Sequence, residues 1–239
     1  MTIDRILKIA FAGALFLSTS CAPTRFVQPI PEGHYAATAS FGGPLIGFGG
    51  LTIPMPLTSL SGAYGATNDL TAFAGLHTTA LLFGDIQLDG GAVYRLAQQS
   101  GMMPSLSVSP ILNLALSTRD GAAELWPELD ANISWRYGEG SAALAMSDST
   151  HNWPDGNTIY FGMSNWFELG VQRSDGEAIP HRWIPNLQLG HIFEGEHWQY
   201  TLEVKYLAVG IPNLPNVVDY RGIGGNGTFG AYFSLTRKF

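Results

Sequence analysis

The last thirteen residues, GTFGAYFSLTRKF at positions 227–239, alternate between apolar and polar side chains, with Arg237 as the exception on the apolar parity. One parity carries Phe229, Ala231, Phe233, Leu235 and Phe239, and the other carries Thr228, Tyr232, Ser234, Thr236 and Lys238. Because successive side chains of a strand point to opposite faces, a period of two predicts a β-strand with one apolar and one polar face. The chain is therefore expected to close on a two-faced strand whose last residue is aromatic.

The same alternation recurs through most of the chain, in segments of about ten residues separated by turn sequences. The clearest segments are 86–96, 105–117, 124–137 and 197–208. Residues 167–172 also alternate clearly, and weaker segments are 34–41, 45–53, 58–67, 70–83, 141–147, 158–164 and 185–194. No apolar run after residue 21 is long enough for a transmembrane helix. The pattern predicts an all-β chain of roughly 10–12 antiparallel strands, read as one barrel domain over 34–239.

The terminal strand ending at Phe239 resembles the final strand of bacterial outer-membrane β-barrels. In that class the terminal aromatic residue is an assembly signal. The resemblance implies that Phe239 serves this role, that the outer-membrane assembly machinery is a partner, and that the host is a diderm bacterium.

The N-terminus resembles a lipoprotein signal peptide. Arg5 and Lys8 precede an apolar stretch over 9–17, and small residues then lead to Cys21, with Ser18 where leucine is usual. The resemblance implies a signal peptide over 1–20 and an acylated Cys21 in contact with membrane lipid. Residues 21–33 would then form a proline-rich, extended tether between the lipid and the first strand.

The composition narrows the class further. Cys21 is the single cysteine, which excludes an intrachain disulfide framework. The formal net charge is −7 and no basic run is present, so nucleic acid is not expected as a partner. Only 13% of residues are charged, while 29 are glycine and 12% are aromatic. These values suit a sheet whose outer face meets lipid better than they suit a soluble globule.

Two barrel classes give this alternation, a membrane barrel with apolar residues outside and a soluble, lipocalin-like barrel with apolar residues inside. Aromatic residues near the ends of the apolar faces favour the membrane class, because such rings suit a bilayer interface. Examples are Trp135, Tyr137, Trp198 and Tyr206. The sequence therefore predicts a transmembrane β-barrel, with the soluble barrel as the alternative.

If the apolar faces meet lipid, the charged residues of the opposite parity line the lumen. They are Asp89, Arg95, Glu128, Asp130, Arg136, Glu168, Glu203 and Lys205. A barrel of this size is narrow enough for side chains to fill. We expect these charges to form a lumen network of ion pairs that seals the barrel, and the alternative is a narrow hydrophilic pore with an acidic lumen.

Chemistry beyond this network is not expected. The glycine pattern at 222–227 precedes a strand rather than a helix, so it does not predict a dinucleotide site. His191 and His197 flank a turn at different heights and do not predict a metal site, and His77 is expected in mid-strand. No nucleophile, base and acid can be combined from their spacing. No catalytic residue, metal or cofactor is therefore predicted.

The expected function is that of a lipid-anchored outer-membrane barrel with a structural, adhesive or narrow-pore role. One alternative is a soluble periplasmic β-barrel lipoprotein that binds a small apolar ligand in its interior. A third is an outer-membrane barrel enzyme that modifies lipid.

Overall fold

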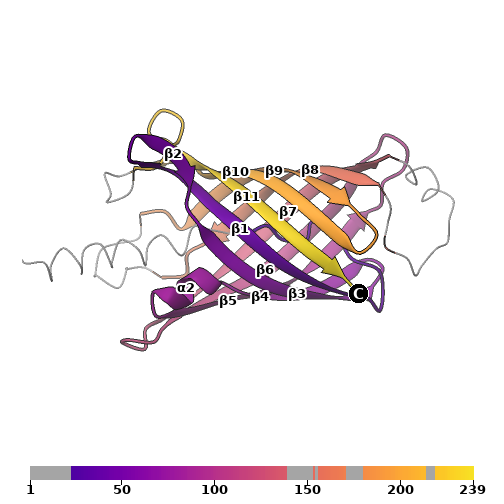
Figure 1. Cartoon of the computed structure of the whole chain (residues 1–239), viewed down its shortest axis with the longest axis horizontal. Helices are drawn as coiled ribbons and strands as arrows, with labels where there is room; N and C mark the ends of the chain where they lie inside the picture. The colour runs from indigo at the N-terminus through magenta and orange to yellow at the C-terminus, as the bar shows by residue number, and fades with distance from the viewer. Residues whose placement is uncertain (1–22, 139–152, 154–155, 171–179, 214–218) are drawn as a thin grey trace, which may run out of the picture.

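Ten antiparallel strands close into a barrel within the described residues, which are 23–138, 153, 156–170, 180–213 and 219–239 of a computed structural model (Figure 1). The strands are β1 (Tyr35–Phe48), β2 (Leu51–Pro54), β3 (Leu57–Thr67), β4 (Leu70–Leu76), β5 (Asp85–Ala97), β6 (Ser105–Ser117), β7 (Ala123–Tyr137), β8 (Asn157–Phe167), β9 (Trp183–Glu194), β10 (Trp198–Pro212) and β11 (Asn226–Lys238). Strand β2 pairs only with the end of β1, so it extends one hairpin beyond the barrel wall. The predicted all-β fold is confirmed.

The first and last wall strands close the barrel. Strand β1 pairs with β11 from Ala36 opposite Lys238 to Pro44 opposite Gly230. Beyond that register, the amide of Phe239 donates to the carbonyl of Tyr35 at 2.9 Å, and the amide of Tyr35 donates back at 3.2 Å. The seam satisfies the backbone groups of both edge strands, which a sheet in lipid requires.

The polarity of the wall distinguishes the two barrel classes. Leu202 and Phe233 point outward and are 51% and 40% exposed. The inward parity is buried and polar, and includes Ser107, Asn113, Asn132, Gln188, Thr201 and Ser234. An apolar outside and a polar inside are the arrangement of a transmembrane barrel of the outer-membrane type. The membrane prediction is confirmed and the soluble, lipocalin-like alternative is wrong.

Aromatic rings gather on the outer surface at the barrel end that holds both Tyr35 and Phe239. The members are Tyr35, Tyr64, Tyr94, Tyr137, Trp198, Tyr200 and Phe239, each 41–63% exposed. Neighbouring strands bring them to one level, as the pairing of Tyr35 with Tyr64 and of Leu70 with Tyr94 shows. A band of this kind marks one membrane interface.

Four predicted segments differ from the structure. The segment 70–83 is not one strand, because β4 ends at Leu76 and the short helix α2 (Thr78–Leu82) follows. The alternation fails there, where Thr78-Thr79 is followed by three apolar residues in succession. Segments 34–41 and 45–53 are joined by the single strand β1, which ends at Phe48, and 51–53 belong to β2. Strand β8 ends at Phe167, and residues 168–170 are in no strand. Segment 141–147 lies outside the described residues.

No helix in the described part of the chain is long and apolar enough to cross a membrane.

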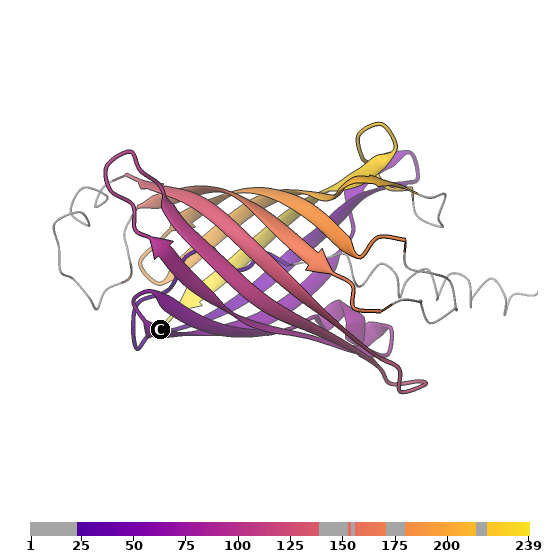
Figure 2. The ribbon, with the colours of Figure 1, turned by 180° about the vertical axis from the view of Figure 1, so that it is seen from behind.

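Residues 23–33, which we call the strap, run inside the barrel and make contacts with strands around it. The carbonyl of Val27 accepts a hydrogen bond from the hydroxyl of Ser107 on β6 at 2.5 Å. The amide of Ile30 donates to the hydroxyl of Thr71 on β4 at 2.8 Å. The segment forms neither helix nor strand, and it bends at 27–28 and turns at 32–33. It lies in the lumen (Figure 2).

Candidate functional site: the strapped lumen

Arg25 of the strap is held by acidic side chains of the barrel wall. Its Nη1 donates to Oε1 of Glu128 at 2.8 Å, and its Nη2 donates to Oδ2 of Asp89 at 3.0 Å. The same Nη2 lies 3.2 Å from Oδ1 of Asn113. The side chains of Asp89 and Glu128 are 3% and 1% exposed, and the side chain of Arg25 is 9% exposed. Removing one partner of a buried pair of this kind leaves an uncompensated charge, which is strongly destabilising.

Three neighbouring strands position the acceptors for Arg25. Asp89 on β5 is directly opposite Asn113 on β6. Asn113 is in turn opposite Trp126 on β7, and Glu128 is the next inward-pointing residue of β7. Other bonds then fix the two carboxylates. Glu128 accepts from the Asn113 amide at 3.0 Å and from the Ser164 hydroxyl at 2.6 Å, while Nε2 of His77 lies 3.1 Å from Oδ2 of Asp89. The acceptors are therefore held by the wall itself.

A second charged group lies on β10. Lys205 Nζ is 3.2 Å from Oε1 of Glu203, and the Tyr160 hydroxyl donates to Oε2 of the same carboxylate at 2.6 Å. Lys205 also donates to the carbonyl of Pro23 at 3.3 Å, which connects this group to the start of the strap. Both charged side chains are almost fully buried. The strap thus touches charged groups on opposite sides of the lumen.

Apolar side chains of the strap complete the filling. Ile30 joins a buried cluster with wall residues, and Phe26 and Trp153 pack against that cluster. Its wall members are Ala36, Ala63, Phe73, Val93 and Ile111. Val27 forms a second cluster with Tyr160 and Ile192. The two clusters place close-packed apolar side chains inside an otherwise polar lumen. The sequence pattern did not predict them.

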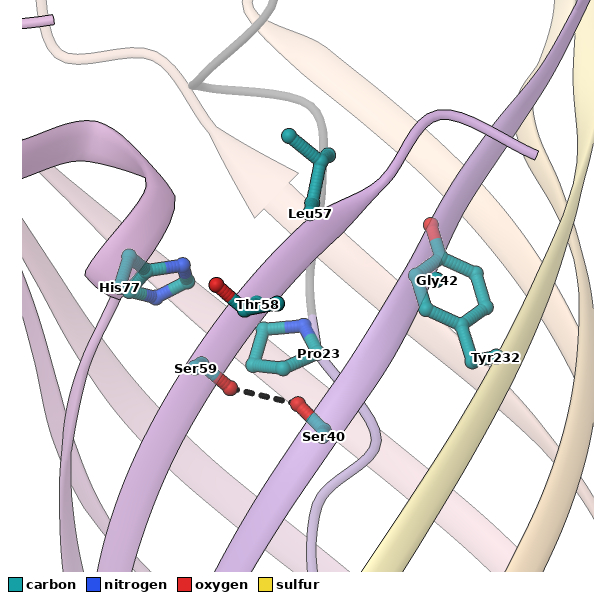
Figure 3. A pocket seen from close by; sticks show the side chains of 8 residues that line it. All are labelled: Pro23, Ser40, Gly42, Leu57, Thr58, Ser59, His77 and Tyr232. Carbon is teal, nitrogen blue, oxygen red and sulfur yellow. Dashed lines mark hydrogen bonds between the residues drawn. The ribbon is translucent and has the colours of Figure 1, made fainter. Parts of the chain in front are cut away.

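Pro23 marks the other end of the strap, near the junction of β1 with the β2 hairpin. Figure 3 shows it beside the hydroxyls of Ser40 on β1 and Ser59 on β3, which are hydrogen-bonded at 2.6 Å, with His77 and Tyr232 on either side. These residues line a small pocket at this level. The strap therefore extends from this pocket towards the end of the barrel where β1 begins.

The predicted lumen residues divide into two sets. Asp89, Glu128, Asp130, Glu203 and Lys205 are buried and point inward, as predicted. Arg95 does not reach Asp89. It lies at the rim, where its Nε is 3.0 Å from Oδ1 of Asp69, and that carboxylate is 62% exposed.

Arg136 and Glu168 also lie away from the central acids. Arg136 Nη2 donates to Oε1 of Gln28 at 2.7 Å, so it holds the strap near the end of β7. Glu168 follows the last residue of β8, and its amide donates to the Arg182 carbonyl at 2.9 Å. Arg95 and Arg136 therefore make these contacts near strand ends, whereas the central acids lie deeper in the lumen.

Arg25 is the cation that the sequence prediction missed. A signal was present, because Arg25 is the only lysine or arginine between Lys8 and Arg95. Cys21 lies outside the described residues. Within the described ranges, no group of three or more histidine, cysteine, aspartate or glutamate side chains is placed to hold a metal ion.

Comparisons with known proteins find similar solved β-barrel structures but no matching protein family. The sequence matches no protein-family model, and no curated protein matches it. Among solved structures, an outer-membrane channel from Pseudomonas putida F1 is 12% identical with a TM-score of 0.45, covering 91% of this chain and all of that one. The translocator domain of the autotransporter NalP from Neisseria meningitidis is 10% identical with a TM-score of 0.40, covering 99% of this chain and 98% of that one. The NanC porin is 7% identical with a TM-score of 0.42, covering 86% and 100%. Similarity this low transfers no role to this chain.

Proposed function

We propose that this protein is an outer-membrane barrel closed by its own N-terminal strap, with a structural or adhesive role rather than that of an open pore. The single observation that carries the proposal is the strap inside the lumen, held by the buried pairs of Arg25 with Asp89 and Glu128. The apolar cluster around Ile30 supports it, because its close-packed side chains fill part of the lumen. With the lumen filled, recognition falls to the connections between strands.

The lengths of the connections support an orientation. At the end where Tyr35 and Phe239 meet, β3 and β4 are joined through Asn68 and Asp69 alone, and β9 and β10 through residues 195–197. The opposite end carries the β2 hairpin, α2 and the connections 168–182 and 213–225. Outer-membrane barrels have short periplasmic turns and longer outer loops. We place the Phe239 end in the periplasm, with residues 138–156 as its one long connection.

The lipid anchor on Cys21 belongs to the same proposal and constrains it. Cys21 precedes Pro23 by two residues, which span at most about 7 Å of extended chain. Pro23 lies near the β2 hairpin, so an acyl group on Cys21 would leave the barrel by the end opposite Phe239. Cys21→Ser is expected to abolish incorporation of labelled palmitate. Equal labelling of the variant and the parent would contradict acylation at this residue.

Conductance in a planar bilayer tests closure. The purified parent is expected to show no steady ion-conducting steps. Arg25→Ala removes the cation that holds the strap, and is expected to raise the frequency of brief openings. Arg237→Ala is the matched control, because Arg237 lies on the outside of the barrel wall near its Phe239 end, over the Trp198 ring and 5.1 Å from its centroid. Steady, ion-selective steps in the parent would contradict a closed barrel.

A narrow pore is the second candidate, favoured by the acidic excess of the lumen. In the central lumen of the described barrel, Asp89, Glu128, Asp130 and Glu203 face Arg25 and Lys205. A lumen without the strap would keep all four acids and lose Arg25. If the barrel opens, we therefore expect it to select cations over anions. We propose no catalytic role.

A further inference from the structure

The acceptors around Arg25 suit a guanidinium group. Asp89, Asn113 and Glu128 receive its two terminal nitrogens from three adjacent strands, at 3.0, 3.2 and 2.8 Å. A guanidinium presents its donors in a fixed planar fork, whereas an ammonium is a compact point charge. Because His77 and Ser164 hold the two carboxylates from the wall side, these acceptors need no strap residue to place them.

A further buried acid on the same inward face, Asp130, has a carboxylate oxygen, Oδ1, that accepts no hydrogen bond from the described residues. Asp130 lies two positions after Glu128 on β7 and is 5% exposed. The acidic group therefore offers more acceptors than Arg25 uses.

We propose that Asp89, Asn113, Glu128 and Asp130 form a guanidinium-binding site in the lumen, which Arg25 fills as a tethered ligand. The external ligand of this site is a guanidinium compound, such as the arginine side chain of a peptide that enters the barrel. This proposal rests on the proposed function, because it requires the strap to occupy the lumen. A short tether gives Arg25 an effective concentration in the millimolar range or above, so a weak free ligand does not displace it.

Chemical rescue of Arg25→Ala in the full chain tests the site. The probe is ethylguanidinium at millimolar concentration, with ethylammonium and sodium chloride at equal ionic strength beside it. Ethylguanidinium is expected to restore at least half of the melting temperature that the variant loses, in a saturable way. Ethylammonium is expected to restore less, and the parent is expected not to respond. The double variant Arg25→Ala, Glu128→Gln is expected to lose the rescue.

Rescue no greater than that of sodium chloride would overturn the site, as would equal rescue by both organic cations. If Arg25→Ala does not fold alone, the readout becomes the yield of heat-modifiable barrel refolded with each cation, with Arg25→Gln as a second variant. Failure of ethylguanidinium to raise that yield for both variants also overturns it. Conductance of the parent keeps the two proposals apart. A closed parent without rescue removes only the guanidinium site, whereas an open parent removes the closed barrel.

Discussion

Among the individual residues, two arginines that the sequence treats alike differ sharply in their surroundings. Arg25 is buried against two carboxylates, whereas Arg95 pairs with an exposed Asp69 at the rim. Arg25→Ala is expected to lower the free energy of unfolding by about 3–5 kcal/mol, because it leaves buried acids uncompensated. Arg95→Ala is expected to cost less than about 1 kcal/mol, as exposed pairs do. Urea titration of both variants in lipid vesicles measures the difference, and equal losses would contradict the assignment.

The residues also show what sequence could predict. The inward direction of Asp89, Glu128 and Lys205 followed from parity alone, because a strand fixes which face each position occupies. Their partners did not follow, since partners depend on register and on how deep each residue lies. The role of Arg25 was not predicted, because Arg25 lies outside any strand. Strand periodicity carries no information on whether a proline-rich segment enters a barrel.

Among the elements, the backbone of the strap packs directly against the backbone of strand β3. The amide of Gly33 donates to the carbonyl of Gly65 at 2.8 Å, and a Cβ on Gly65 would overlap the carbonyl of Pro31. Gly65→Ala is expected to shift the end of the strap and to cost roughly 1–3 kcal/mol, as overpacking does. Gly62→Ala on the outward face of β3 is the control, because its Cβ meets no atom closer than 4.0 Å. Thermal unfolding of the two variants should separate them, and equal melting temperatures would argue against the strap contact.

The terminal strand gives a prediction about assembly. Phe239 is 63% exposed on the outer surface and pairs with Tyr35 at the seam. Its deletion removes both the aromatic group and the last backbone pair, so the amount of heat-modifiable protein in outer-membrane fractions is expected to fall. Phe239→Tyr keeps the ring and the backbone bonds and serves as the control. Normal folding and location of the deleted chain would show that the terminal aromatic residue is not an assembly signal.

For the whole molecule, closure depends on a segment with no regular structure of its own. The barrel followed from repeated alternation, and its even number of strands fits chain ends that meet at one seam. The filling of the lumen could not be predicted in this way, because it combines the strap with clusters from β1, β3, β4, β5 and β6. The central claim is therefore that residues 23–33 lie inside the barrel.

Cross-linking between the strap and the wall tests that claim most directly. Gln28 Nε2 donates to Ser134 Oγ at 2.7 Å, and the chain offers a cysteine-free background once Cys21 is replaced by serine. In that background, Gln28→Cys with Ser134→Cys should be joined by a bifunctional methanethiosulfonate with an ethane spacer, as mass spectrometry of the folded barrel would show. The wall pair Ser40→Cys and Ser59→Cys, whose hydroxyls are 2.6 Å apart, is the positive control. A cross-linked wall pair with no cross-link to the strap would contradict a strap inside the lumen.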